Sequence, residues 1–274
     1  IHNGLRKTGF VVTGALAIGS LLLVSQPQAM AASPVGPQLA GTATPKAKTT
    51  PVVKKDKLAW RKEGESLFKA RDYKGAINAY TQAIKLGDNI AETYAGRGEA
   101  YIKIGKYQAA IDDLDIAIEK DDSETEYLLL RGRAYGKLGQ REEAFNDFEA
   151  ALKLDSSLAR AHIERGDVYY DANEYDEAIE YYDKALELDE DSSTAYNNRG
   201  NAYSGKNDEE KAIEDYTKSL DLKIDAVTLA NRCWSYRLQG ELDKAKEDCD
   251  RAIEVDDAEG FAYESRGRLY YAQD

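Results

Sequence analysis

From residue 57 to the end of the chain, apolar residues recur at intervals of three and four, which is the spacing of amphipathic helices. Residues 91–122, AETYAGRGEAYIKIGKYQAAIDDLDIAIEKDD, show two such stretches on either side of Gly105, a residue suited to end a helix and begin a turn. Small residues at Gly98, Ala110 and Ala117 allow two antiparallel helices to approach closely. The pattern therefore predicts a helical hairpin whose apolar face is buried only when a second hairpin stacks against it.

The hairpin pattern returns at a nearly constant period of 34 residues. One small residue marks each unit, and a large residue follows three positions later in every case. An alanine follows twelve positions later in each of the units that continue that far. The marking residues are Gly64, Gly98, Gly132, Gly166, Gly200, Cys233 and Gly267. We therefore predict a repeat array over 57–274, with units at 57–90, 91–124, 125–158, 159–192, 193–225 and 226–259 and a partial unit at 260–274.

The spacing Gly-x2-Tyr followed by Ala-x3-aromatic-x2-Ala resembles the tetratricopeptide repeat, over the whole of residues 57–274. This resemblance implies an all-α fold, a right-handed superhelical solenoid of antiparallel helix pairs with about six repeats and a final single helix. It also implies a non-catalytic scaffold that binds a partner protein or an extended peptide in its concave groove. Two alternatives stay open: a regulatory or targeting segment of a longer envelope protein, and, less favoured, an enzyme-associated factor of the cell envelope.

The resemblance also implies which residues face the groove, because certain first-helix positions of tetratricopeptide repeats line it. We expect the asparagines among them to hydrogen-bond a peptide backbone, and the exposed apolar and aromatic side chains to anchor peptide side chains. The competing interpretation is that some of these residues pack against neighbouring helices, Trp234 above all. The predicted groove residues are Leu129, Leu130, Arg133, Arg160, Ile163, Asp167, Tyr170, Asn197, Asn198, Asn201, Asn231 and Trp234.

An arginine stands directly before the marking residue in most units, at Arg97, Arg131, Arg165, Arg199, Arg232 and Arg266. Sixteen positions further on, four units carry an aspartate: Asp113, Asp147, Asp215 and Asp248. Tyr181 occupies that position in the unit of Arg165 and breaks the series. Because a residue that recurs in every unit generally serves the repeat itself, we predict Arg–Asp pairs that join the two helices of a unit, in preference to a ladder of ligand-binding arginines.

The only two cysteines, Cys233 and Cys249, lie in one predicted hairpin at equal distances from its turn at Gly240–Glu241. Residues placed in this way lie opposite each other in antiparallel helices, and the position of Cys233 is a close crossing because glycine occupies it elsewhere. The alternative is two buried thiols that act as small apolar groups. We predict a structural disulfide, favoured further if the chain is exported to an oxidising compartment.

The first residues of the chain have the layout of a secretory signal peptide. Arg6 and Lys7 precede an uncharged apolar run over 8–24, and Ala29 and Ala31 fit the small-x-small pattern of a cleavage site. We predict a signal peptide at 1–31 that is cleaved after Ala31, although an uncleaved membrane anchor is the alternative. A flexible linker rich in Pro, Ala, Thr and Lys is expected over 32–56.

The acidic composition of the chain argues against two classes of binding partner. A formal net charge of −13 disfavours nucleic acid and anionic membrane surfaces, which both attract basic proteins.

His162 is the only histidine after the leader, and we expect it to pack in the core. The sequence offers no cluster for catalysis, metal binding or cofactor binding. We therefore expect other proteins or peptides of the envelope as partners, no stable membrane insertion after signal cleavage, and a periplasmic location, with thylakoid lumen or full secretion as alternatives. The sequence leaves the oligomeric state open.

Overall fold

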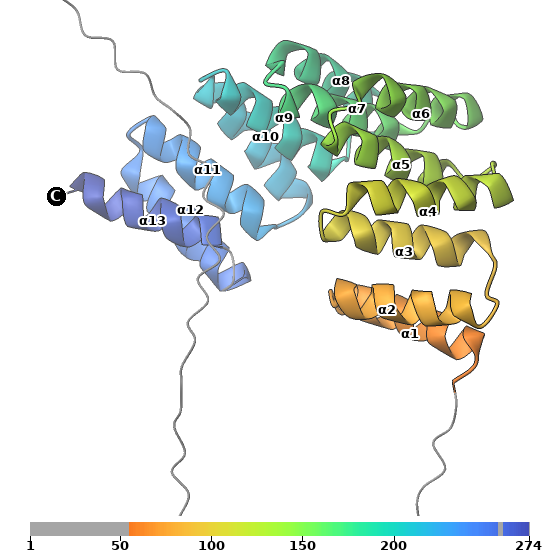
Figure 1. Ribbon diagram of the computed structural model, residues 1–274. Helices are drawn as coiled ribbons and strands as arrows, with labels where there is room; N and C mark the ends of the chain where they lie inside the picture. The colour runs from red at the N-terminus through yellow and green to blue at the C-terminus, as the bar shows by residue number, and fades with distance from the viewer. Residues whose placement is uncertain (1–54, 257–259, 274) are drawn as a thin grey trace, which may run out of the picture. The chain divides into compact units, whose positions relative to one another are not determined.

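The computed structural model describes residues 55–256 and 260–273, and within these ranges it contains α-helices and no strand (Figure 1). The all-α prediction is confirmed. The predicted signal peptide and nearly all of the predicted linker lie outside the described residues. The helices are α1 (Lys57–Lys69), α2 (Tyr73–Lys85), α3 (Ala91–Lys103), α4 (Tyr107–Lys120), α5 (Thr125–Lys137), α6 (Arg141–Leu154), α7 (Ala159–Asp171), α8 (Tyr175–Leu188), α9 (Ser193–Gly205), α10 (Glu209–Leu222), α11 (Ala226–Leu238), α12 (Leu242–Val255) and α13 (Gly260–Gln273).

Consecutive helices form hairpins, and each hairpin packs against the next (Figure 1). The second helix of a pair contacts the first helix of the following pair, as α4 contacts α5 and α8 contacts α9. First helices of neighbouring pairs also meet, as α5 meets α7 and α9 meets α11. Every odd-numbered helix begins at the residue where the sequence pattern placed the start of a unit. The described residues therefore form the predicted solenoid of helix pairs.

The turns inside the hairpins use left-handed backbone conformations. Gly105 has φ +74°, and the N–H of the next residue, Lys106, donates to the carbonyl oxygen of Tyr101 at 2.9 Å. Asn173 takes the equivalent place after α7 with φ +60°. Glycine and asparagine tolerate this conformation better than other residues, which explains why the turn follows the first helix at a fixed position.

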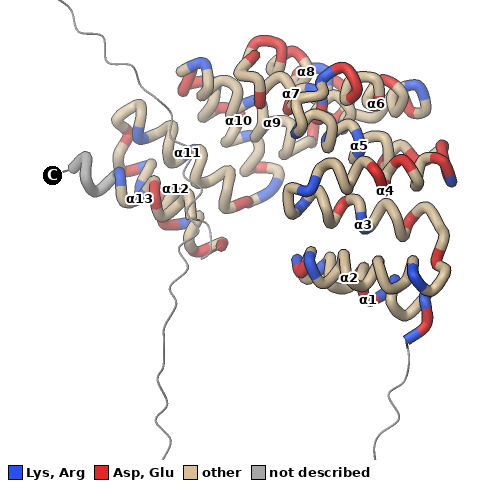
Figure 2. Tube along the Cα trace, in the orientation of Figure 1, with Lys and Arg blue, Asp and Glu red and all other residues tan. Residues whose placement is uncertain are grey.

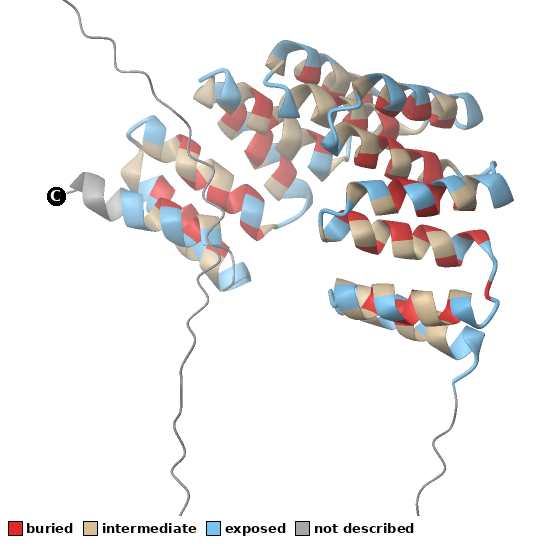
Figure 3. Cartoon of the chain, in the orientation of Figure 1, coloured by how far each residue is buried: buried red, intermediate tan, exposed pale blue. Residues whose placement is uncertain are grey.

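In the hairpins that carry a marking glycine between two helices, the core contains alanines and one large side chain over that glycine, and the buried residues lie on the faces between helices (Figure 3). A Cβ added to Gly132 would lie 2.5 Å from the ring of Phe148, and one added to Gly166 would lie 2.5 Å from the ring of Tyr182. Gly267 differs, because an added Cβ would meet nothing within 4 Å. The marking glycines that face a ring are therefore required by close packing and not by backbone strain.

The predicted Arg–Asp pairs are confirmed in four units. The Nε and Nη2 atoms of Arg131 donate to the two carboxylate oxygens of Asp147 at 2.9 and 2.7 Å, and Arg97, Arg199 and Arg232 bind their own aspartates in the same two-bonded way. The carboxylates are buried, since Asp147 is only 5% exposed. Each pair therefore neutralises a buried charge and ties the two helices of one hairpin together.

The predicted disulfide between Cys233 and Cys249 is present, with 5.5 Å between the two Cα atoms. It joins α11 to α12, and both cysteines are fully buried. In the preceding hairpin the same two positions hold Gly200 and Tyr216, whose ring covers the glycine. The disulfide thus fills the space that a ring over a glycine fills in other repeats.

Basic residues occur in every described helix, whereas α2, α9 and α11 contain no acidic residue (Figure 2). The described helices are each too short or too polar to serve as a membrane span.

Candidate binding groove

The apolar residues predicted for the groove are in the core. Leu129, Leu130 and Ile163 are 1%, 2% and 7% exposed, and each belongs to a cluster of buried residues between helices. They are therefore unable to anchor a peptide side chain, and this part of the prediction is wrong. The physical reason is that the neighbouring hairpin covers them, and a position within one repeat does not reveal how far its neighbour extends.

The two predicted groove arginines are engaged between α5 and α7. Arg133 of α5 binds both carboxylate oxygens of Glu164 on α7, one of them at 2.8 Å from Nε. Arg160 of α7 forms an ion pair in the opposite direction, with Glu126 of α5. Glu164 is only 4% exposed, so its charge depends on these arginines for compensation. Both arginines therefore hold two repeats together.

The polar residues predicted on α7, α9 and α11 form one hydrogen-bonded network. The side-chain amide of Asn198 donates to Asp167 Oδ1 at 2.9 Å, and that of Asn197 donates to Asn198 Oδ1 at 3.2 Å. Nδ2 of Asn231 donates to Asn197 Oδ1 at 3.3 Å and to Asn201 Oδ1 at 3.0 Å. The sequence placed these five residues on one face, and the structure brings all of them into contact.

Two tyrosines that were not predicted for the groove reach the network from the core side. The hydroxyl of Tyr182 donates to Asp167 Oδ1 at 2.7 Å, and the hydroxyl of Tyr216 donates to Asn201 Oδ1 at 2.8 Å. Both rings lie in the core over a marking glycine, and only their hydroxyls reach the groove. A signal was available: tyrosine occurs at this position where the same unit carries Asp167 or Asn201, whereas Phe148 accompanies Arg133.

Asn201 is one of the residues that line a pocket with aromatic and small polar walls: Tyr170, Asn201, Ser204, Gly205, Tyr216, Asn231, Trp234 and Phe261. Its amide oxygen accepts two hydrogen bonds, from Tyr216 and Asn231, which uses both lone pairs and fixes the amide. Its Nδ2 group has no acceptor among the described residues, and it is not buried. The pocket thus presents a fixed, unused hydrogen-bond donor beside aromatic rings.

Trp234 forms one wall of this pocket and is half-buried. Its ring lies 5.9 Å from that of Phe261, and the guanidinium carbons of Arg237 and Arg268 lie 4.1 and 5.3 Å from its centroid. The sequence left open whether Trp234 would line the groove or pack against a neighbouring helix. In the structure it does both, because one side of the ring contacts α13 residues while the residue still borders the pocket.

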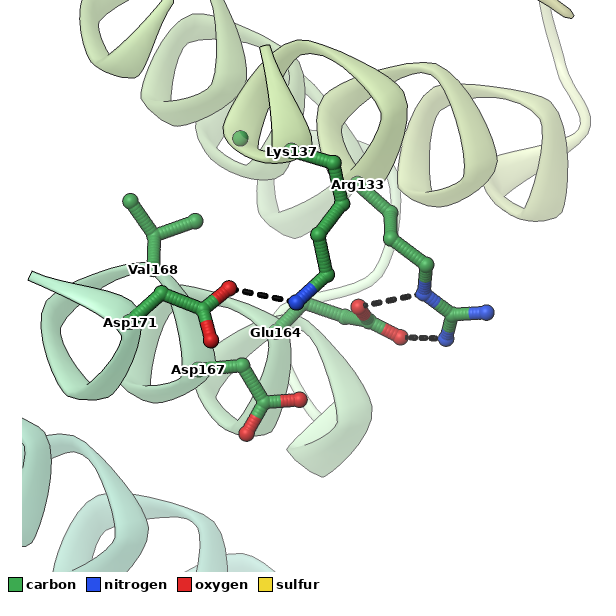
Figure 4. A pocket seen from close by; sticks show the side chains of 7 residues that line it. Arg133, Lys137, Glu164, Asp167, Val168 and Asp171 are labelled. Atoms are coloured by element: carbon green, nitrogen blue, oxygen red, sulfur yellow. Dashed lines mark hydrogen bonds and ion pairs between the residues drawn. The ribbon is translucent and has the colours of Figure 1, made fainter. Parts of the chain in front are cut away.

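A second pocket lies between α5 and α7, lined by Arg133, Gly136, Lys137, Glu164, Asp167, Val168 and Asp171 (Figure 4). Arg133 pairs there with Glu164, and Lys137 pairs with Asp171. Asp167 forms no ion pair with the other residues drawn in Figure 4. Burial, followed by the nearby charge of Glu164, raises the pKa of Asp167 from 3.8 to about 6.

Replacing Asp167 with asparagine is expected to stabilise the protein above pH 6 and to have little effect below pH 4. The raised pKa means that the folded protein binds a proton between about pH 4 and 6 that the unfolded chain has released, so the stability contributed by this group falls as pH rises through that window. Asparagine keeps an acceptor for Tyr182 and carries no charge. Urea denaturation at pH 4 to 8 measures the effect.

Asp171→Asn is the matched control, because this exposed carboxylate has a cationic partner in Lys137. We expect no stabilisation from that change at any pH. A gain for Asp167→Asn that is equally large at pH 4 and pH 8 would contradict the assignment.

Within residues 55–256 and 260–273, no cluster of three or more His, Cys, Asp or Glu residues is arranged to hold a metal ion. The network offers amides, hydroxyls and one carboxylate as hydrogen-bonding groups, and the adjacent pocket offers aromatic surface. Chemically, such an arrangement binds polar backbone groups and neighbouring side chains of an extended segment.

Comparison with family models supports the repeat assignment along most of the array. A tetratricopeptide repeat model matches residues 61–125 and another matches residues 193–223, while a model described as TPR repeat matches residues 132–172 and 166–207. No curated protein matches the chain.

Several solved structures are similar to this chain. A tetratricopeptide repeat protein from Parabacteroides merdae is 18% identical with a TM-score of 0.68, and the match covers 80% of this chain and 86% of that one. Yeast Tom70 is 18% identical with a TM-score of 0.67, and the match covers 79% of this chain and 46% of that one. MamA is 28% identical with a TM-score of 0.47, and the match covers 61% of this chain and 91% of that one. The first two likenesses show the same solenoid fold.

Proposed function

Because the chain belongs to the tetratricopeptide repeat family, whose members generally bind other proteins or peptides, we propose that it is a non-catalytic scaffold that binds an extended segment of a partner protein along α7, α9 and α11. The observation that carries this proposal is the fixed amide of Asn201. Its oxygen is saturated by two internal hydrogen bonds, and its two N–H groups are left for a ligand.

The pocket around Asn201 suits a peptide in extended conformation. A backbone carbonyl of the peptide accepts a hydrogen bond from Asn201 Nδ2, and the adjacent side chain packs against Tyr170 and Trp234. The asparagine network costs little entropy to organise on binding, because its amides already hold one another in place. Leu129, Leu130 and Ile163 have no part in the proposal.

Replacing Asn201 with aspartate is expected to weaken peptide binding at least tenfold, which is about 1.4 kcal/mol. Aspartate has nearly the same shape and still accepts from Tyr216 and Asn231, but it lacks the N–H donors and repels a peptide carbonyl. The measurement begins with selection of heptapeptides from a phage-displayed random library on the full chain. Fluorescence anisotropy of the labelled peptides then gives the dissociation constants.

Asn146→Asp is the matched control, because it makes the same chemical change at an exposed residue of α6. It should leave the affinity within a factor of two. The proposal fails if no sequence is enriched, or if the two variants bind the selected peptides equally well.

We also propose that the protein works outside the cytoplasm, in the periplasm in preference to a thylakoid lumen or the external medium. The basic start, apolar run and Ala-Met-Ala pattern of residues 1–31 support this, and a buried disulfide suits an oxidising compartment. The expected partners are consequently proteins or peptides of the envelope. Mass spectrometry of the protein isolated from its host should find a mature N-terminus at Ala32.

A further inference from the structure

Arg165 is the member of the arginine series that has no carboxylate partner. Its counterpart Arg131 in the preceding unit binds both oxygens of an aspartate, but the position opposite Arg165 holds Tyr181. Among the described residues, none accepts a hydrogen bond from any N–H of Arg165. A guanidinium with five donors and no acceptor is unusual inside a fold that pairs the same side chain elsewhere.

In neighbouring units the arginine also binds a second carboxylate, but the equivalent carboxylate near Arg165 is paired with a lysine. Nη1 of Arg131 and of Arg199 reaches an aspartate on the second helix of the preceding hairpin, at 2.6 and 2.5 Å. The equivalent residue for Arg165 is Glu149 of α6, whose carboxylate instead binds Lys153 at 3.0 Å. The charge of Arg165 therefore lacks a bonded counter-charge within the described protein.

Two aromatic rings contact the guanidinium of Arg165, whereas carboxylates bind the equivalent guanidinium in other units. Its central carbon lies 4.4 Å from the ring centroid of Phe145 on α6 and 4.7 Å from that of Tyr181 on α8. Tyr181 is in turn stacked on Tyr169, with 5.3 Å between centroids and 8° between planes. Rings at these distances attract the cation and restrict its orientation without neutralising its charge.

The exposed edge of this guanidinium can be identified. Nε of Arg165 is buried without a partner, whereas neither Nη atom is among the buried, unpartnered atoms. In the paired units the aspartate occupies the edge formed by Nε and Nη2, and that edge is closed here. The edge formed by Nη1 and Nη2 is left accessible, and it presents two parallel N–H donors at the spacing of carboxylate oxygens.

No carboxylate of the described residues binds this edge, because Glu149, whose charge acts on Arg165 through space, is paired with Lys153. Lys184 lies over the same ring, with Nζ 4.4 Å from the centroid of Tyr181, and is itself paired with Glu180. His162 stacks against Tyr181 at 6.3 Å between centroids. Burial, then the charges of Lys184 and Arg165, lowers the pKa of His162, so the imidazole is neutral at pH 7. Arg165 is therefore a positive charge without a bonded carboxylate among the described residues, on a chain of net charge −13.

This surface is separate from the candidate groove. Arg165 and Asp167 are two residues apart on α7, and successive residues of a helix are rotated by about 100°, so their side chains leave the helix on nearly opposite sides. Groove binding and binding at Arg165 can therefore be measured independently.

We propose that Arg165, held between Phe145 and Tyr181, is a second binding site, which takes the carboxylate of an aspartate or glutamate in an acidic segment of a partner protein. The Nη1 and Nη2 atoms donate to the two carboxylate oxygens. A carboxylate brings the single charge that Arg165 balances, whereas a phosphate group of charge about −1.5 to −2 would leave excess negative charge on an already acidic protein. The partner segment therefore completes the ion pair that the other four repeats complete internally.

Titration of the full chain with N-acetyl-Gly-Glu-Glu-Gly-amide, followed by the backbone amide NMR signals of α7 and α8, tests the proposal. We expect saturable shifts of these signals at low ionic strength, and no shifts with the corresponding Gln-Gln peptide. Tyr181→Asp should weaken binding at least tenfold, because it restores the internal pair of the other units. Arg165→Gln should do the same without altering the aromatic cluster, so the test does not depend on one variant folding, and the spectra report the fold of each.

Arg251→Gln is the charge-matched control, since it removes an exposed arginine from α12, and it should leave the affinity unchanged. Glu149→Gln should strengthen binding, because it removes a carboxylate whose charge acts on Arg165. The proposal is overturned if the glutamate peptide causes no shifts, if Tyr181→Asp and Arg165→Gln bind as tightly as the unmodified chain, or if inorganic phosphate binds more tightly than the peptide. Selected groove peptides should bind Arg165→Gln normally, so failure here leaves the proposed function standing.

Discussion

Replacing Phe148 with alanine is expected to lower the free energy of unfolding by about 3–5 kcal/mol, the usual cost of emptying a fully buried aromatic site. Phe148 has no exposed surface, and its ring lies directly over Gly132 of the facing helix. The cavity would form at the crossing of α5 and α6, and the Arg131–Asp147 pair, which joins the same two helices, opposes their movement into it. Urea denaturation followed by circular dichroism measures the loss.

The contact between Phe148 and Gly132 allows a sharper test than truncation alone. Gly132→Ala should destabilise the protein by about 1–3 kcal/mol, because its Cβ would lie 2.5 Å from the ring and the ring has little room to move. In the Phe148→Ala background the same change should cost nothing or stabilise the protein, since the methyl group enters the cavity. The two changes are therefore expected to be strongly non-additive.

Gly267→Ala is the control for this cycle. An added Cβ there meets no atom within 4 Å, so only the preference of alanine over glycine in a helix acts, and stability should stay the same or rise by up to about 1 kcal/mol. Additive effects of Gly132→Ala and Phe148→Ala would show that the ring over the glycine does not determine the hairpin crossing.

The second large effect is expected from loss of the disulfide. Replacing both Cys233 and Cys249 with alanine should lower stability by about 3 kcal/mol, because the bond closes a loop of 16 residues in the unfolded chain. Contacts in a repeat array are made with neighbours only, so the loss should be local. Hydrogen exchange should show weakened protection in α11, α12 and α13 and unchanged protection in α3 to α6.

A paired replacement separates the bond from the packing around it. Cys233→Gly with Cys249→Tyr installs the ring-over-glycine contact of Gly200 and Tyr216, and we expect it to recover part of the lost stability without any covalent link. Protein isolated from its host and digested without reductant should yield the two cysteine peptides joined. Free thiols in that sample, or full stability of the double alanine variant, would contradict a structural role.

The sequence alone was sufficient for the helix pairs and their order. Helical periodicity and the marking residues are local properties, and they recur so often that chance agreement at Gly132, Gly166 and Gly200 is excluded. The pairing of side chains within one hairpin could be predicted for the same reason. A separation of sixteen residues places Arg131 opposite Asp147 and Cys233 opposite Cys249 whenever two antiparallel helices meet at a fixed turn.

The candidate groove was predictable only in part. The asparagines were placed on one face by the resemblance to the tetratricopeptide repeat, which implies which first-helix positions share that face. Their mutual hydrogen bonds, and the reach of the Tyr182 and Tyr216 hydroxyls through the core, depend on distances between different repeats. Asn201 stands out only once Tyr216 and Asn231 are seen to use up its oxygen.

Exposure was decided by the tertiary structure alone. Leu129 and Leu130 occupy positions that line the groove in the family pattern, but the adjacent hairpin buries them almost completely. The sequence shows Tyr181 in place of the aspartate that would face Arg165, but only the structure shows that Phe145 of the neighbouring hairpin covers the guanidinium and that Glu149 binds Lys153 instead. The physical reason is the same in both cases: a repeat pattern encodes how a helix pair folds on itself, whereas burial and unsatisfied charge depend on the side chains that the neighbouring pair brings.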